Sequence, residues 1–219
     1  MSAEETVVAW ERFETELARV APLSHSMLRP PASEEKIAAA EGELGMAFPA
    51  GLRALYLRHD GVHEAEHFAD YPYDVPPDPA DPFWRYQNAV CFLPGNSAWL
   101  SLGRAVELAE QVAMYADADD EPGRIPFLSQ VTDSDMSGMW VDAEGAMGTW
   151  TDAGTLDPAG CSVAEYLADA ARALATRTAC QVTDGETPYR SPSGDGLGWV
   201  DADAPDVVEA HLQDGWRAV

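Results

Sequence analysis

The sequence predicts an α+β fold, with a largely antiparallel sheet flanked by helices in a single domain. Three helical patterns come first, consecutive short strand patterns follow, and a further helical pattern comes after them. That order is typical of α+β proteins. Strands and helices do not alternate, which counts against the parallel sheet of a Rossmann-type domain. With 219 residues, of which 46% are hydrophobic, the chain is long enough to bury a core.

The first three helices are predicted from apolar spacing and from the residues at their ends. Residues 4–20 carry apolar side chains every three or four positions, which gives a helix one apolar face. In the second helix, Ser33 can cap the first turn and Gly45 is the natural end. In the third, Pro49 is expected at the first helical position and Gly61 at the end.

The sheet is predicted in the second half of the chain. A short strand is expected at 88–95 and a helix at 102–116, followed by three strands at 125–132, 138–143 and 147–152. The helix is expected to direct three small residues inward, namely Val106, Ala109 and Ala113.

The last predicted helix covers 161–177, and its inward residues are Val163, Tyr166, Leu167, Ala170 and Leu174. We expect the domain to span 1–177, including the N-terminal helix. Residues 178–219 are rich in Gly, Pro and Asp. They are expected to form a C-terminal extension of unknown role, with one short hairpin around 196–201.

The chain is strongly acidic, because 38 Asp and Glu against 13 Lys and Arg give a formal net charge of −25. A surface of that charge repels nucleic acid and anionic lipid, and it attracts basic proteins. We therefore expect a protein partner, and neither a nucleic acid nor a membrane. A general bias in composition explains the charge equally well, since only one of the basic residues is lysine.

The expected location is the cytoplasm. The N-terminus is acidic and lacks the basic start and long apolar stretch of a signal peptide. No apolar run is long enough to cross a bilayer. The three cysteines are widely spaced, which suits free thiols in a reducing compartment: Cys91, Cys161 and Cys180.

A long irregular loop is predicted at 60–82. It holds seven acidic residues, several prolines, and neither lysine nor arginine. Loops of this length inside a compact domain usually serve a function. This acidic segment is therefore the first candidate for partner binding.

Residues 63–67 read HEAEH and match H-E-x-x-H, which on a helix holds zinc between two histidines. Gly61 and Pro72 interrupt any helix on either side, and no third ligand follows at a suitable distance. We therefore interpret the string as part of the acidic segment, and we expect no cofactor and no catalytic residue. Two alternatives stay open: a zinc-dependent hydrolase, and adventitious metal binding by His59, His63 and His67.

Residues 133–144 place Asp, Ser, Gly and Glu at the ligand positions of a calcium-binding EF-hand loop. The flanking segments are strand patterns rather than helices, so a turn between two strands is the better interpretation. The cysteines have no basic neighbours in the sequence that would activate a thiol, and nothing matches a nucleophile elbow. The sequence does not predict an enzyme.

The segment LRPPASEEKIAAAEGELGMAFPAGLRALYLRHDG, residues 28–61, carries an ordered set of positions: Pro31, Glu41, Leu44, Gly45, Pro49, Leu52, Tyr56, Asp60 and Gly61. This order resembles the opening of the SUKH superfamily of fungal cell-wall-synthesis regulators and bacterial toxin-immunity proteins. Residues 125–142 resemble the second landmark of that family, and the resemblance covers roughly 23–175. It implies a SUKH-like fold in which these positions are structural and not catalytic.

The resemblance also implies a non-enzymatic protein-binding module. For bacterial members it implies an immunity protein that neutralises a toxin domain, often a nuclease, whose basic groove carboxylates can occupy. A housekeeping regulator or scaffold of the same family is the alternative. The aromatic residues in or beside the acidic segment are either interface anchors or contacts to the core. The expected interface residues are Glu64, Glu66, Asp70, Tyr71, Tyr73, Asp74, Asp78, Asp81, Phe83 and Trp84.

Overall fold

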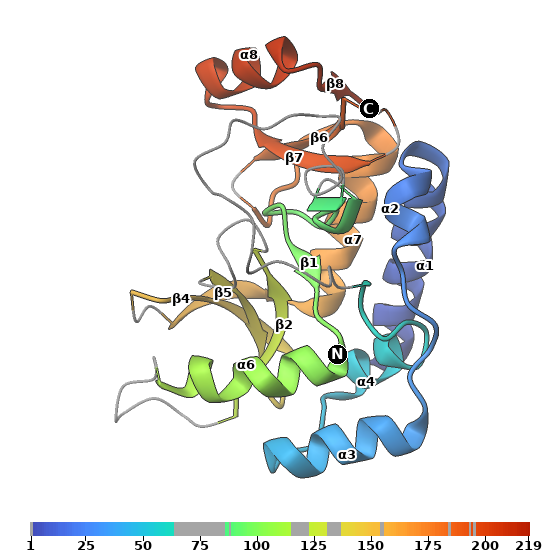
Figure 1. Cartoon of the computed structure of the whole chain (residues 1–219), viewed down its shortest axis with the longest axis vertical. Coiled ribbons are helices and arrows are strands. Elements are labelled where there is room, and N and C mark those ends of the chain that lie inside the picture. Colours follow the sequence, from blue (N-terminus) through green and yellow to red (C-terminus); the bar gives the residue numbers. More distant parts are fainter. Residues whose placement is uncertain are drawn as a thin grey trace.

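The computed structural model describes residues 2–63, 86–87, 89–114, 123–130, 137–153, 156–183, 185–192, 194 and 196–219. Their fold is the predicted α+β class, with antiparallel sheets surrounded by helices (Figure 1). The helices are α1 (Ala3–Val20), α2 (Pro22–Ser26), α3 (Glu34–Leu44), α4 (Ala50–Tyr56), α6 (Leu102–Met114), α7 (Val163–Thr176) and α8 (Pro205–Gln213). The strands are β1 (Ala98–Trp99), β2 (Ile125–Ser129), β3 (Ser137–Val141), β4 (Ala146–Thr151), β5 (Leu156–Ser162), β6 (Glu186–Arg190), β7 (Leu197–Asp201) and β8 (Arg217–Ala218).

The N-terminal helices begin and end close to the predicted residues. The hydroxyl of Ser33 accepts a hydrogen bond from the first turn of α3, and Gly45 ends that helix in the left-handed conformation with φ 68°. Helix α4 differs by one position, because Pro49 is its N-cap rather than its first helical residue. It also ends at Tyr56, so Gly61 lies beyond the helix in the turn that follows.

Helix α6 presents a different face from the predicted one. Its buried residues include Ala105, Leu108 and Val112. Of the predicted residues, Val106 is partly buried against the core, whereas Ala113 is exposed. Both faces carry small apolar residues, so spacing alone does not choose between them. The helix packs against β2 and α3, and the larger Leu108 takes the buried position there.

The three central strands of the larger sheet match the three predicted strands. Its strand order is β1-β2-β3-β4-β5, and every neighbouring pair is antiparallel. The β3–β4 register places Trp140 opposite Gly148. The Trp140 ring therefore lies against Gly148, where β4 has no side chain.

Two predictions in this part of the chain were wrong or incomplete. The strand expected at 88–95 is absent from its described residues: 89–90 are helical, and pairing is limited to a bridge between Leu93 and Ser97. Strand β5 was not predicted, because Pro158 and Gly160 are residues that strands disfavour. β5 is the last strand of this sheet, where an unpaired outer edge tolerates proline.

The core is built around buried aromatic rings. Trp99 lies 5.0 Å from Trp10 on α1, 5.7 Å from Tyr56 on α4, and 6.0 Å from Phe127 on β2, measured between ring centroids. Helix α7 packs along α1, as Figure 1 shows, and all of its predicted inward residues are buried. This cluster joins the helices to the sheet.

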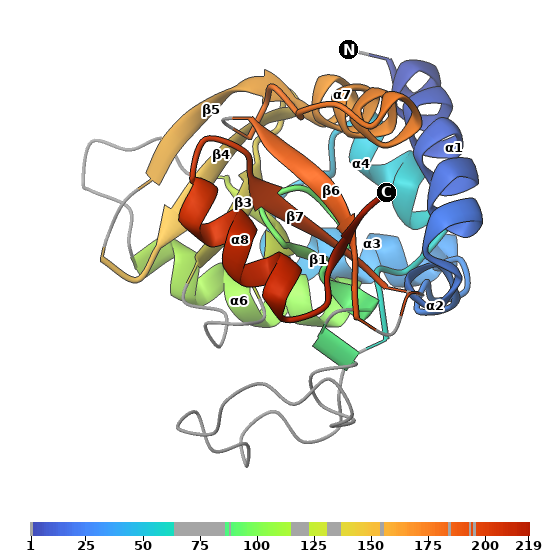
Figure 2. The ribbon, with the colours of Figure 1, turned by 90° about the horizontal axis from the view of Figure 1, so that it is seen from above.

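The C-terminal residues form a second sheet of order β7-β6-β8, with α8 beside β7 (Figure 2). The hairpin expected around 196–201 is present as β7, which pairs with β6. Leu197, Trp199 and Val219 are buried in the same hydrophobic cluster as the aromatic core. The segment after residue 177 therefore shares one core with the helices and the larger sheet.

We predict that Gly148→Ala destabilises the protein strongly. A Cβ at this position would overlap the Trp140 ring and the Asp157 carbonyl, neither of which can move without disturbing the sheet. The expected loss in unfolding free energy is about 3 kcal/mol, measured by urea denaturation. Gly42→Ala is the matched control. Gly42 lies at an exposed position in α3, and a Cβ added there meets no atom within 4 Å. It is expected to raise stability by roughly 0.5 kcal/mol. Equal effects of the two changes would contradict the packing argument.

We predict a stability change with pH that depends on His59. Its Nδ1–H donates to the Arg29 carbonyl at 2.9 Å, and Nε2 lies 3.2 Å from the Glu14 carboxylate. Burial lowers the pKa of His59, but these two contacts outweigh burial and raise the pKa above its ordinary value. The protonated ring therefore contributes stability that is complete below the unfolded pKa of about 6.5 and is lost as pH rises through the folded pKa.

Urea denaturation at pH 6 and pH 8 measures this effect. The difference in unfolding free energy between the wild type and His59→Gln should be larger at pH 6 than at pH 8. Glu14→Gln should abolish the same pH dependence, since it removes the carboxylate that faces Nε2. A His59→Gln protein whose stability follows pH as the wild type does would show the assignment to be wrong.

Candidate functional site

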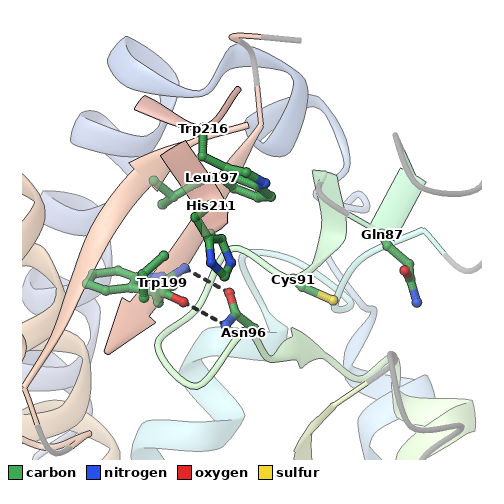
Figure 3. Close-up of a pocket in the computed structure, with 9 residues that line it drawn as sticks. Gln87, Cys91, Asn96, Leu197, Trp199, His211 and Trp216 are labelled. Carbon is green, nitrogen blue, oxygen red and sulfur yellow. Dashed lines mark hydrogen bonds between the residues drawn. The ribbon is translucent and has the colours of Figure 1, made fainter. Parts of the chain in front are cut away.

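A turn between residues 93 and 97 holds the C-terminal sheet against the rest of the protein. Asn96 lies in the left-handed region at φ 48°. Its side-chain amide pairs with the backbone of β7 as a neighbouring strand would. Its Nδ2 donates to the Trp199 carbonyl at 2.7 Å, and its Oδ1 accepts from the Trp199 amide at 2.8 Å (Figure 3). Asparagine suits the site because it tolerates the left-handed conformation and carries both a donor and an acceptor.

Further hydrogen bonds strengthen this docking. The indole Nε1 of Trp199 donates to the Phe92 carbonyl at 2.8 Å, and the Gly95 amide donates to the Glu186 carboxylate at 2.6 Å. Trp199 itself is 2% exposed. β6 and β7 are thus fixed to the turn through backbone groups as well as through apolar packing.

A pocket of about 200 Å³ lies at this junction. Figure 3 shows residues of the C-terminal elements on one side and residues of the preceding segment on the other. The pocket is open to solvent, and it is lined by Gln87, Cys91, Asn96, Leu197, Gly198, Trp199, Val200, His211 and Trp216. We name it the junction pocket.

The polar side chains of the junction pocket include both donors and acceptors. Gln87 is 4% exposed, and its Oε1 has no hydrogen-bond partner. Nδ1 of His211 lies 2.9 Å from the Val207 carbonyl, so Nδ1 carries a proton and donates it to this carbonyl. An unpaired buried carbonyl oxygen is costly and uncommon in folded proteins.

The aromatic wall depends on a glycine. The rings of His211 and Trp216 meet at 5.7 Å between centroids. A Cβ on Gly198 would lie 2.7 Å from the Trp216 ring, so only glycine lets the indole rest on β7. The ring is therefore held in place while part of it stays exposed.

The expected interface residues, from Glu64 to Trp84, lie outside the described residues. Both flanks of that stretch are described. The Val62 amide donates to the Trp99 carbonyl at 3.0 Å, and the Tyr86 hydroxyl donates to the His63 carbonyl. His63 and Tyr86, the described residues on either side of that stretch, are thus in contact. Gln87 of the junction pocket comes directly after Tyr86.

The metal-site interpretations gain no support from the described residues. His63 is exposed, and Glu64–His67 lie outside the described residues. Both ring nitrogens of His59 already have partners, the Arg29 carbonyl and the Glu14 carboxylate. Among residues whose positions are described, no three His, Cys, Asp or Glu side chains lie close enough to share a metal ion. Of the calcium-loop positions, Ser137 and Gly138 lie within β3, which pairs with β2.

The thiols of Cys161 and Cys180 are poor nucleophiles. Burial raises the pKa of Cys180 to about 12, and burial beside Glu165 and Asp169 raises the pKa of Cys161. Cys91 is buried. A thiol that stays protonated at neutral pH does not attack a substrate readily.

The positions of the ordered set in residues 28–61 meet at structural joints. The Glu41 carboxylate accepts from the Phe48 amide at 3.0 Å, and the Tyr56 hydroxyl donates to the Leu100 carbonyl at 3.1 Å. The Asp60 carboxylate accepts from the Leu102 amide at 2.9 Å and lies 3.4 Å from Arg29 Nη2. These contacts bind α3, α4 and the start of α6 to one another.

The sequence pattern of the SMI1 / KNR4 family (SUKH-1) matches residues 31–168, more than half of the chain. The chain belongs to this family. The match includes α3, α4, α6 and the larger sheet, and it ends within α7. No curated protein matches the chain. No helix in the described ranges is long and apolar enough to cross a membrane.

The junction pocket of this SUKH-1 protein was not predicted from the sequence. Helix α8 was not predicted either, although Pro205 at the first turn, followed by Asp206, is a helix-start signal. No local pattern indicates that Asn96 and Trp199 meet, because they are 103 residues apart.

We predict that Asn96→Asp loosens the docking of the C-terminal sheet. Aspartate has the same shape and tolerates the left-handed conformation, but its second oxygen would face the Trp199 carbonyl in place of a donor. The expected loss in unfolding free energy is about 2 kcal/mol, measured by urea denaturation. Gln181→Glu adds the same charge at an exposed site and should change stability by less than about 0.5 kcal/mol. Unchanged stability of Asn96→Asp would refute the docking role.

Proposed function

We propose that this SUKH-1 protein is a non-enzymatic binding module of the immunity type, which neutralises a basic toxin domain. Membership of the SMI1 / KNR4 family (SUKH-1) over residues 31–168 carries the proposal. The formal net charge of −25 supports a basic partner. A nuclease fits best, because its phosphate-binding groove is a basic surface that carboxylates can fill.

The proposal assigns binding and no chemistry to this chain. The thiols of Cys161 and Cys180 are held in their protonated form, and His59 is engaged in the core. Neutralisation therefore follows from covering the active groove of the toxin. Inhibition should be stoichiometric and should be lost when the complex dissociates.

The acidic segment supplies the proposed interface. Its carboxylates would speed association by long-range attraction, and the neighbouring aromatic residues would provide contact area. Alanine variants of Tyr71 and Trp84 distinguish anchoring from core packing. Loss of affinity at an unchanged melting temperature supports an anchor, whereas a lower melting temperature supports packing on the core.

The main test starts from the genes beside the gene for this chain, and the product of an adjacent toxin-type gene is purified as the partner. Neutralising the six acids of the interface set should weaken binding at low salt by about tenfold or more, chiefly by slowing association. Biolayer interferometry at two salt concentrations measures the association rate and the affinity. The variant carries Glu64→Gln, Glu66→Gln, Asp70→Asn, Asp74→Asn, Asp78→Asn and Asp81→Asn.

A matched control removes the same number of charges from exposed sites elsewhere: Glu4, Glu43, Glu110, Glu144, Asp152 and Asp157. This control should bind within about threefold of the wild type, because the removed charges are dispersed over the surface. Full binding by the first variant would disprove the interface. Absence of any complex with the toxin, together with capture of a host protein, would favour the regulatory or scaffold role.

A further inference from the structure

We propose that the C-terminal sheet carries a binding site for one phosphate group, formed by Arg190 on β6 with Arg217 beside it on β8 (Figure 1). The inference goes beyond the proposed function and does not rest on it, since it needs no toxin partner. It concerns positive charge in a chain whose formal net charge is −25. Both arginines lie after the residues that the family pattern matches.

Arg190 differs from the other partly buried arginines of the described residues. These arginines are Arg29, Arg53, Arg58, Arg104, Arg124 and Arg190. The first four each lie within 3.4 Å of a carboxylate, and Arg124 lies over the Trp140 ring. Within the described part of the chain, the Arg190 guanidinium has no hydrogen bond and no ion pair. It stays unpaired in a chain that has 38 acids for 13 basic residues.

The Arg190 side chain is covered up to its terminal nitrogens. Nε is buried, so it is not itself a contact for a ligand. Nη1 and Nη2 are not among the buried unpaired atoms, so these two nitrogens reach solvent. The residue opposite Arg190 on β7 is Leu197, which is buried in the core. A side chain that is already held in this way loses little conformational entropy when its terminal nitrogens bind an anion.

Arg217 adds a second positive charge beside Arg190. The two residues lie directly opposite each other in the β6–β8 pairing, so their side chains start from one face of the sheet with Cβ atoms about 5 Å apart. Nη1 of Arg217 donates to the Leu212 and Trp216 carbonyls, which anchor this side chain without neutralising it. Like charges directly opposite each other destabilise a sheet. A bound anion would relieve that repulsion.

The neighbouring elements do not neutralise these two charges. In the described ranges, neither Arg190 nor Arg217 lies within 4.0 Å of a carboxylate. The Glu186 carboxylate on β6 accepts from the Gly95 amide, and Asp214 is exposed without pairing to Arg217. Helix α2 meets the end of β7 and reads PLSHS, which contains no acid.

The charge of the site favours a phosphate group. A guanidinium donates two parallel hydrogen bonds to the oxygens of a phosphate or a carboxylate. A phosphate group carries a charge of about −1.5 to −2 at neutral pH, which matches two arginines better than the single charge of a carboxylate. A small anion responds mainly to charges within the Debye length of about 8 Å, so the net charge of the chain does not prevent binding. A polyanion such as nucleic acid would still be repelled.

The first experiment titrates the full chain with inorganic phosphate at pH 7.5. The Nε–H resonance of Arg190 is followed by NMR, and it is assigned as the resonance that disappears in Arg190→Lys. Phosphate should shift it saturably, and acetate should bind about tenfold more weakly. Sodium chloride at equal ionic strength should give no saturable shift.

A second titration identifies the source of the phosphate group. Nα-acetyl-phosphoserine methylamide represents a phosphorylated protein. Tighter binding of this compound than of inorganic phosphate would uphold the site and assign it to a phosphorylated partner. Tighter binding of inorganic phosphate would uphold the site and assign it to a small free anion.

Charge-removing variants test which arginine binds. Arg190→Gln should weaken phosphate binding by about tenfold or more, and Arg217→Gln should weaken it less, because Arg217 contributes mainly charge. Without phosphate, Arg190→Gln should melt at the same temperature as the wild type or higher, since it removes the repulsion across the strands. Arg12→Gln is the matched control, because it removes the same charge from an exposed site on α1.

The melting temperature in phosphate provides a readout for every variant. Phosphate bound to the folded chain should raise the melting temperature of the wild type and of Arg12→Gln equally. The rise should be smaller for Arg190→Gln, which keeps only the general stabilisation by phosphate salts that all three proteins share.

Three results would overturn the inference. The first is the absence of a saturable shift with phosphate. The second is acetate binding as tight as phosphate binding, because the match to a doubly charged anion would then be wrong. The third is an equal effect of phosphate on Arg190→Gln and on the Arg12→Gln control. All of these measurements use the chain alone, so they are independent of toxin neutralisation.

Discussion

The buried carboxylate of Asp60 joins parts of the chain that are far apart in the sequence. One oxygen accepts from the Leu102 amide at the start of α6, and the other faces Arg29 ahead of α3. The next residue, Gly61, has φ 69° and room for no side chain, since a Cβ would lie 2.6 Å from the backbone of Leu100. A buried charge without such partners is costly. This arrangement of Asp60 and Gly61 therefore forms only when α4, β1 and α6 come together.

The excess of negative charge is not balanced within the described surface. Several arginines pair with nearby carboxylates, as Arg19 does with Glu16 and Arg53 with Glu34. Exposed pairs of this kind add little stability, and mutual repulsion among the other acids lowers it. The buried aromatic core around Trp99 offsets this cost. In the proposed function, the unbalanced charge acts during association with a basic partner.

The region after the family match forms one side of the junction pocket and part of the core. β6, β7, β8 and α8 lie beyond residue 168, and they close the junction pocket against the turn that contains Asn96. Leu197, Trp199 and Val219 of this region are buried in the same hydrophobic cluster as the family-matched elements, and the region also forms one wall of the pocket.

The sequence by itself determined the helix ends at Ser33 and Gly45, the three central strands and the acidic character, because these depend on neighbouring residues or on composition. The tertiary structure alone decided which face of α6 is buried and that the chain near Pro158 becomes an edge strand. It also decided that Asn96 pairs with Trp199 across 103 residues and so creates the pocket. Local preferences are nearly equal at such positions, and contacts between distant segments supply the free energy that selects one arrangement.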